Sequence, residues 1–106
     1  MTRVVTVLEA RVAEDRVADL QAAYAEAARG PFPPGLVRSS LLRHSSDLTL
    51  WSIQTVWHSH EALAAMRAAG KPRGVQIFEA AGASPSLSVF DAIAELGPPG
   101  EPGSLT

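Results

Sequence analysis

The stretch of residues 48–69, LTLWSIQTVWHSHEALAAMRAA, constrains the fold more than any other part of the chain, because a strand pattern passes directly into a helix pattern. A period of two along its first ten residues places one set of side chains on one face of a strand, namely Trp51, Ile53, Thr55 and Trp57. The opposite face is also largely apolar and carries Leu48, Leu50, Ser52, Gln54 and Val56. We therefore expect both faces of this strand to be covered.

The period changes after Trp57. Ser59 is placed to cap the N-terminus of a helix whose apolar positions are Leu63 and Met66. Gly70 then ends this helix. The stretch is thus a strand that feeds a helix able to fold back over one face of the same strand.

Five further segments carry a recognisable period. The predicted elements are a strand at Val4–Val12, a helix at Glu14–Arg29, a strand at Leu36–His44, a short helix at Gly74–Ala81 and a strand at Leu87–Ile93. The tripeptide Ser-Ser-Asp at 45–47 predicts a hairpin turn between the second strand and the strand with the two tryptophans. Residues 97–106, GPPGEPGSLT, predict a flexible tail after one domain of residues 1–96.

The order of these elements predicts an α+β fold of the ferredoxin-like, split β-α-β-β-α-β type. In such a fold an antiparallel four-stranded sheet carries both helices on one face and leaves the other face bare. The strand at 48–57 is nevertheless apolar on both sides. The same face of a second copy would cover this bare face of the sheet without any other partner. We therefore expect a homodimer with two facing sheets, a dimeric α/β barrel.

Composition limits the possible partners. Hydrophobic residues make up 46% of the 106 residues and charged residues 19%, which is typical of a globular domain. The net charge is −2 with both signs interspersed, so we expect neither nucleic acid nor an anionic membrane as a partner. The first ten residues do not resemble a signal peptide, and we expect a cytoplasmic protein. Cysteine is absent, which excludes disulfides, thiolate metal sites and a cysteine nucleophile.

Residues 55–63, TVWHSHEAL, resemble a pattern of the antibiotic biosynthesis monooxygenase family: a strand, a Trp, a capping Ser or Asp, and a helix start that is acidic, Ala and large apolar. The order of elements extends this resemblance over residues 3–96. The resemblance implies an enzyme that oxidises an electron-rich aromatic polyketide, such as an anthrone, or a quinol. It also implies molecular oxygen as the co-substrate and no metal, flavin or other cofactor.

A haem-degrading branch of the same fold is disfavoured. The resemblance implies that this branch needs an Asn in the first strand, a Trp nine residues after the strand Trp, and a His in the following helical region. Here the second position is Met66, residues 71–83 contain no His, and the chain contains no Asn at all. The missing Asn also matters for anthrone oxidation, where the resemblance implies that an Asn amide and a Trp indole hold the substrate oxygens.

Trp57 and His44 are the candidate catalytic residues. The Trp57 indole N–H could hold a substrate oxygen, with a purely packed core Trp as the alternative. Imidazole is half-titrated near neutral pH, so His44 could act as a base, with an exposed hairpin histidine as the alternative. The candidates for the donor that would hold a substrate oxygen in place of the missing Asn are His44, Arg38, Gln54 and Tyr24.

The remaining candidates are residues that would line a cavity between the helices and the sheet, namely Tyr24, Leu63, Met66, Ile77 and Phe78. Trp51 shares the face of Trp57 and is a further candidate for substrate binding, with a purely packed core Trp as the favoured alternative. His58 and His60 have a spacing found in metal sites, but converging ligands other than Glu61 are not evident, and no metal is expected.

Two hypotheses from different classes follow. The first is a cofactor-independent monooxygenase that binds a flat aromatic or quinol substrate in an apolar pocket between helices and sheet. The second is a non-catalytic small-molecule-binding or assembly module with the same dimeric fold. Trp57 and the family resemblance favour the first, whereas the missing Asn favours the second.

Overall fold

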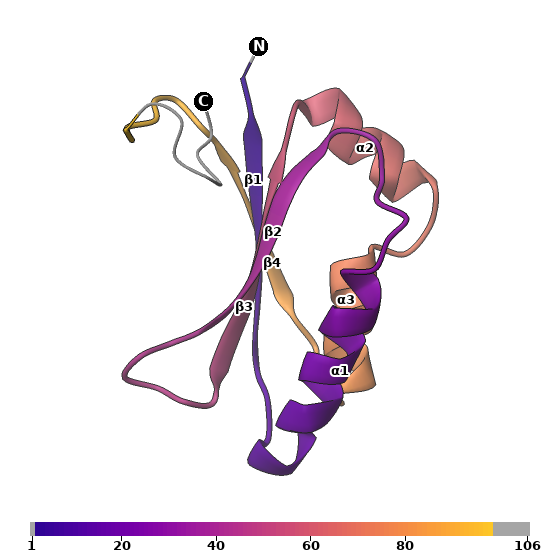
Figure 1. The fold of residues 1–106 in the computed structure, drawn as a ribbon, viewed down its shortest axis with the longest axis vertical. Helices are drawn as coiled ribbons and strands as arrows, with labels where there is room; N and C mark the ends of the chain where they lie inside the picture. The colour runs from indigo at the N-terminus through magenta and orange to yellow at the C-terminus, as the bar shows by residue number, and fades with distance from the viewer. Residues whose placement is uncertain (1, 99–106) are drawn as a thin grey trace.

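An antiparallel sheet of four strands forms one layer of the molecule, and all the helices lie on one of its faces (Figure 1). The structure is a computed structural model that describes residues 2–98. The predicted ferredoxin-like fold, with its antiparallel sheet and one helical face, is confirmed. Within residues 2–98, no helix is long and apolar enough to cross a membrane. The predicted tail at 97–106 falls almost entirely outside the described residues.

The elements follow the predicted order with small differences at their ends. They are β1 (Val4–Arg11), the 3-10 turn η1 (Glu14–Arg16), α1 (Val17–Ala27), β2 (Leu36–Arg43), β3 (Leu50–Trp57), α2 (His60–Ala68), α3 (Arg73–Ala80) and β4 (Ser86–Asp91). The strand order is β2-β3-β1-β4, and every neighbouring pair is antiparallel. Ser59 caps α2 as predicted, since its Oγ accepts a hydrogen bond from the Ala62 N–H at 3.1 Å.

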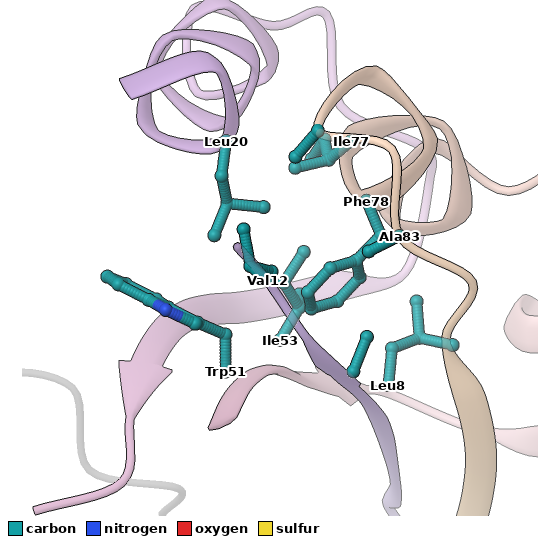
Figure 2. Close-up of a cluster of buried hydrophobic side chains, with 10 residues drawn as sticks. Leu8, Val12, Leu20, Trp51, Ile53, Ile77, Phe78 and Ala83 are labelled. Carbon is teal, nitrogen blue, oxygen red and sulfur yellow. The ribbon is translucent and has the colours of Figure 1, made fainter. Parts of the chain in front are cut away.

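The larger part of the core lies where α1 and α3 cover one end of the sheet. Figure 2 shows Leu20 of α1 and Phe78 of α3 pointing toward Ile53 of β3 and Val12, the residue that follows β1. Leu20 and Phe78 are completely buried. The alternation of β1 and β3 explains this cluster, because every second side chain of each strand faces the helices.

A smaller cluster lies at the other end of the sheet, beneath α2. It consists of Val4, Trp57 and Leu63, with Met66 packed against it. Along β1 the two clusters are separated by Thr6, and along β3 they are separated by Thr55. The sheet therefore carries short polar side chains between its two apolar ends, at the level where α2 gives way to α1 and α3.

The connection between α1 and β2 is pinned to the start of α2. The Gly35 carbonyl accepts a hydrogen bond from the His58 N–H at 2.8 Å. Gly35 has a φ of 85°, and an added Cβ would lie 2.4 Å from the Cβ of Ala62. Only glycine combines this backbone conformation with this close approach, so Gly35 holds the connection over the helical face of the sheet.

Candidate active site

A cavity of about 500 Å³ lies between the sheet and the helices. Its floor is formed by residues of β1, β2 and β3, namely Thr6, Leu8, Leu36, Val37, Ser39, Ile53, Thr55 and Trp57. Its walls come from α1, from the connection at 31–33 and from α2 and α3, and include Tyr24, Ala27, Phe32, Leu63, Met66, Arg67, Arg73, Val75 and Ile77. Small-molecule sites commonly occupy about 300–1,000 Å³ and are mostly apolar, as this one is.

Three hydroxyl side chains in adjacent strands cross the cavity floor. Strand register pairs Ser39 of β2 with Thr55 of β3, and Thr55 with Thr6 of β1. We call Ser39, Thr55 and Thr6 the hydroxyl row. These side chains are short, so they fill little of the volume between the sheet and the helices at this level. The unfilled volume is part of the cavity.

Two larger side chains reach the hydroxyl row from its ends. Tyr24 of α1 donates its O–H to Ser39 Oγ at 3.1 Å, and Thr55 Oγ1 lies 3.4 Å from the same oxygen. The Trp57 indole N–H donates to Thr6 Oγ1 at 3.2 Å, and this contact is buried. Each hydroxyl keeps further donor or acceptor capacity, so the floor can hydrogen-bond an oxygen of a bound ligand.

The structure brings five of the ten predicted site residues together in the cavity: Tyr24, Trp57, Leu63, Met66 and Ile77. Tyr24 and Trp57 bring hydrogen-bonding groups, and the other three bring apolar surface. Trp57 presents its ring to the cavity, while its N–H is engaged by Thr6. The indole therefore acts first as an apolar wall and as an anchor of Thr6.

Arg38 and Gln54 lie on the opposite, open face of the sheet. Gln54 alternates with the cavity residues Ile53 and Thr55. Arg38 would share the face of Leu36 in a regular strand, but an irregularity of the β2 and β3 register falls between these two residues. This bulge places Ser39 instead of Arg38 over the cavity.

His44 lies in the turn between β2 and β3, away from the cavity lining. Its Nδ1 accepts hydrogen bonds from the backbone N–H groups of Ser46 and Asp47, both at 3.1 Å. The imidazole thereby stabilises the turn. This geometry supports the hairpin alternative for His44.

Trp51 and Phe78 belong to the larger core cluster, where Figure 2 shows them on either side of Ile53 and Val12. Trp51 is 5% exposed, and the Arg43 guanidinium lies over its ring at 5.6 Å from the ring centroid. Trp51 Nε1 has no hydrogen-bond partner within the described residues. Both residues pack the end of the sheet beyond the cavity.

Histidines near α2 do not form a metal site in the part of the chain that the structure describes, where no group of three His, Cys, Asp or Glu converges. His60 instead pairs through Nε2 with Asp91 at the end of β4. Among the residues that the structure describes, Asp47 has a pKa well below its usual value. The Arg11 guanidinium and the Thr49 hydroxyl and N–H hold the pKa of Asp47 at about 2, and this pair lies at the turn, outside the cavity.

Four polar residues of the cavity were not among the predicted site residues, namely Thr6, Ser39, Arg67 and Arg73. Thr55 was placed on the face of Trp57 but was not proposed as part of a site. The strand alternation could have identified Thr6 and Thr55 as facing the helices. The register that joins them to Ser39 comes from long-range pairing and leaves no local pattern in the sequence.

Comparisons with known proteins agree with this fold. The family model for antibiotic biosynthesis monooxygenase matches residues 3–72, which is more than half of the chain. A variant of SnoaB, a cofactor-independent oxygenase from Streptomyces nogalater, is 26% identical with a TM-score of 0.68, and the match covers 89% of this chain and 96% of that one.

Another SnoaB structure is 24% identical with a TM-score of 0.63, over 93% of this chain and 99% of that one. A candidate antibiotic biosynthesis monooxygenase from Caulobacter crescentus is 17% identical with a TM-score of 0.69, over 88% and 92% of the two chains. A search of the curated proteins finds no match. The match of the family model over residues 3–72, together with the shared fold, shows that this chain belongs to the antibiotic biosynthesis monooxygenase family.

Proposed function

We propose that this protein is a cofactor-independent monooxygenase that oxidises an electron-rich aromatic substrate of the anthrone or quinol type. The observation that carries the proposal is the apolar cavity of about 500 Å³ with the hydroxyl row across its floor. A flat aromatic ring would occupy the apolar part, and a ring oxygen would meet the hydroxyls. The family and the likeness to a cofactor-independent oxygenase support the same reaction class.

The reaction needs little from the protein beyond binding and electrostatics. Loss of a proton from the substrate leaves an electron-rich anion, which reduces molecular oxygen directly. One oxygen atom enters the substrate and the other leaves as water, so that oxidation of an anthrone methylene to a carbonyl supplies all four electrons. The first proton passes to water at the cavity opening, and a proton is taken up again when the O–O bond of the peroxide breaks, so both methylene hydrogens end in the released water.

The hydroxyl row stabilises the charge that develops on the substrate oxygen. Ser39 accepts from Tyr24 and lies beside Thr55, so its own O–H is left to donate into the cavity. Donors already fixed by neighbouring hydrogen bonds cost little reorganisation when charge appears. Ser39 thus donates to the substrate oxygen, and Tyr24 orients the Ser39 hydroxyl. His44, Arg38 and Gln54 were the other candidates for this donor.

Oxygen uptake with a panel of anthrones and naphthoquinols tests the proposal, with ¹⁸O₂ used to confirm that one labelled atom enters the product. Ser39→Ala should lower kcat/KM by about ten- to a hundredfold, because it removes a hydrogen bond to a developing charge. Tyr24→Phe should also lower kcat/KM, because it removes the hydrogen bond that orients the Ser39 hydroxyl. Ser40→Ala is the matched control, because Ser40 is the next residue of β2 and alternates to the open face. No enzyme-dependent oxygen uptake with any member of the panel would contradict the proposal.

The alternative is a non-catalytic binding module with the same cavity. The observation that favours it is that, within residues 2–98, no carboxylate or imidazole lines the cavity as a base. The same experiment separates the two functions. A ligand that binds in the cavity and is not oxidised by oxygen would identify a binding module.

A further inference from the structure

We infer that the ligand of this cavity carries a carboxylate in addition to its aromatic ring, and that Arg67 and Arg73 bind that carboxylate at the cavity opening. The inference rests on the proposed function for the aromatic part of the ligand. It adds the charge of the ligand and the orientation in which the ligand enters.

Arg67 and Arg73 lie on either side of the turn that joins α2 to α3. Arg67 is in the last turn of α2, and Arg73 is the first residue of α3. Both residues line the cavity and both are exposed to solvent, so they stand where the cavity opens. Met66, Pro72 and Val75 line the cavity beside them and provide an apolar entrance.

The charge of the cavity is opposite to that of the chain. The full chain has a net charge of −2, whereas the described cavity lining contains two arginines and no Asp, Glu, Lys or His. Two positive charges at the edge of an apolar hollow attract an anion and raise its local concentration. A neutral ligand would gain no such attraction from the two arginines.

Arg67 and Arg73 differ from most other cations of the chain in having no acidic partner. Five basic residues form ion pairs with carboxylates, namely Arg3, Arg11, Arg16, Arg29 and Lys71. Among residues 2–98, neither Arg67 nor Arg73 forms an ion pair or a side-chain hydrogen bond. Glu26 borders a hollow next to Arg73, but its carboxylate accepts from Arg29 Nη1 at 3.1 Å.

The two polar regions of the cavity suit two different groups of one ligand. The hydroxyl row is neutral and suits a phenol or carbonyl oxygen, whereas a guanidinium presents a planar fork of donors that matches a carboxylate. The apolar surface lies between them. A flat ligand with a ring oxygen at one end and a carboxylate at the other would satisfy both regions and cover the apolar surface with its rings.

The test compares anthraquinone-2-carboxylate with the neutral anthraquinone-2-carboxamide, which has nearly the same shape. Both compounds are already quinones, so neither is oxidised as a substrate during the measurement. Binding is measured by quenching of tryptophan fluorescence, because Trp57 lines the cavity. The parent protein should bind the carboxylate about five- to thirtyfold more tightly, as expected for a charge-assisted contact weakened by solvent. This preference should shrink as sodium chloride is added.

Variants then assign the preference to the two arginines. Arg67→Gln with Arg73→Gln should abolish the preference by weakening the binding of the carboxylate to about the affinity that the same variant has for the carboxamide. Lys71→Gln is the matched control, because it removes a neighbouring positive charge that does not line the cavity, and it should keep the preference. Circular dichroism melting shows whether each variant is folded.

The outcomes separate this inference from the proposed function. Equal affinity of the parent protein for the two ligands would overturn the carboxylate inference and leave the proposed oxidation to the oxygen-uptake assay. Binding of neither ligand would overturn the inference together with the aromatic cavity on which it rests. If the double variant does not fold, the comparison of the two ligands on the parent protein and its salt dependence still decide the matter.

Discussion

At the scale of single residues, the two tryptophans show how the same side chain takes different roles on one strand face. Trp57 is buried beside the cavity and its N–H has a partner in Thr6, whereas the buried N–H of Trp51 has none within the described residues. A buried donor with a partner stabilises the fold, and one without a partner costs free energy. The two residues should therefore respond differently to the same substitution.

Trp57→Phe should lower the free energy of unfolding by about 1–2 kcal/mol, because it removes the hydrogen bond to Thr6 and reduces a buried side chain. In a domain of this size that corresponds to a melting temperature lower by roughly 4–15 °C. The aromatic wall is retained, so ligand affinity per folded molecule should change less than in Tyr24→Phe. Thermal melting and ligand titration of both variants check this expectation.

Trp51→Phe is the matched control for Trp57→Phe. It also reduces a buried side chain, but it removes a donor that has no partner. The gain from the lost unpaired donor offsets part of the packing loss, so stability should change by less than about 1 kcal/mol. An equal or larger loss in Trp51→Phe than in Trp57→Phe would contradict the assigned role of the hydrogen bond between Trp57 and Thr6.

The sequence predicts these residues to the extent that their placement is local. Tyr24, Leu63 and Ile77 each lie on the apolar stripe of their own helix, so the period of that helix is enough to place them near a cavity. Trp57 and Thr6 meet across 51 residues of sequence, and only the strand register joins them. The open-face position of the candidate Arg38 was not predictable for a related reason, because a bulge reverses the alternation of β2 and has no mark in the sequence.

At the scale of elements, the connection between α1 and β2 decides how the cavity is closed. Gly35 fixes this connection against α2, and the neighbouring residues Phe32 and Pro33 line the cavity. The prolines in this stretch follow the end of α1 and cannot continue a helix. Their position over the cavity was not predictable, since it depends on contacts with α2 that lie far along the chain.

Gly35→Ala should destabilise the protein by about 2–4 kcal/mol, because it adds strain at a φ of 85° and a clash with the Ala62 methyl group. Gly70→Ala is the control, since Gly70 also has a positive φ but an added Cβ there would have no atom within 4 Å. Chemical denaturation of both variants measures the difference. A loss in Gly35→Ala no larger than that in Gly70→Ala would show that the clash is relieved at little cost.

In the turn between β2 and β3, Asp47 forms an ion pair with Arg11 that lowers the pKa of the Asp47 carboxyl. Hydrogen bonds from Arg11 and Thr49 lower the pKa of Asp47 to about 2, so the folded state favours the ionised carboxylate. This stabilising contribution is present in full above the unfolded-state pKa of about 3.8 and is lost as the pH falls through about 2. Arg11→Gln should raise the pKa of Asp47 toward 3.8.

A carbon-detected NMR titration of the Asp47 carboxyl measures this shift directly. Arg29→Gln removes a similar charge far from the turn and should leave the pKa of Asp47 at about 2. The thermal stability of the parent protein should fall more steeply between pH 4 and pH 2 than that of Arg11→Gln. Identical pH profiles of the two proteins would contradict the assigned role of Arg11.

At the scale of the whole molecule, one face of the sheet is not covered by any helix of the described residues. All helices lie on the other side (Figure 1). Leu42 and Phe90 point to the open face and are 44% and 53% exposed, and the half-buried Val5 and Val7 lie on the same face at its centre. Large exposed apolar surface of this kind is typical of an interface.

We expect the protein to be a homodimer in which two copies pack their open sheet faces together, burying about 1,600 Å² or more in total. Light scattering should give twice the protomer mass of 11.2 kDa. Phe90→Glu should shift the protein to monomer, because it places a charge in the interface while replacing a side chain that the protomer leaves exposed. Ala64→Glu, on the exposed side of α2, should remain a dimer. A parent protein of 11.2 kDa at micromolar concentration would contradict the dimer, and a dimeric Phe90→Glu would place its interface elsewhere.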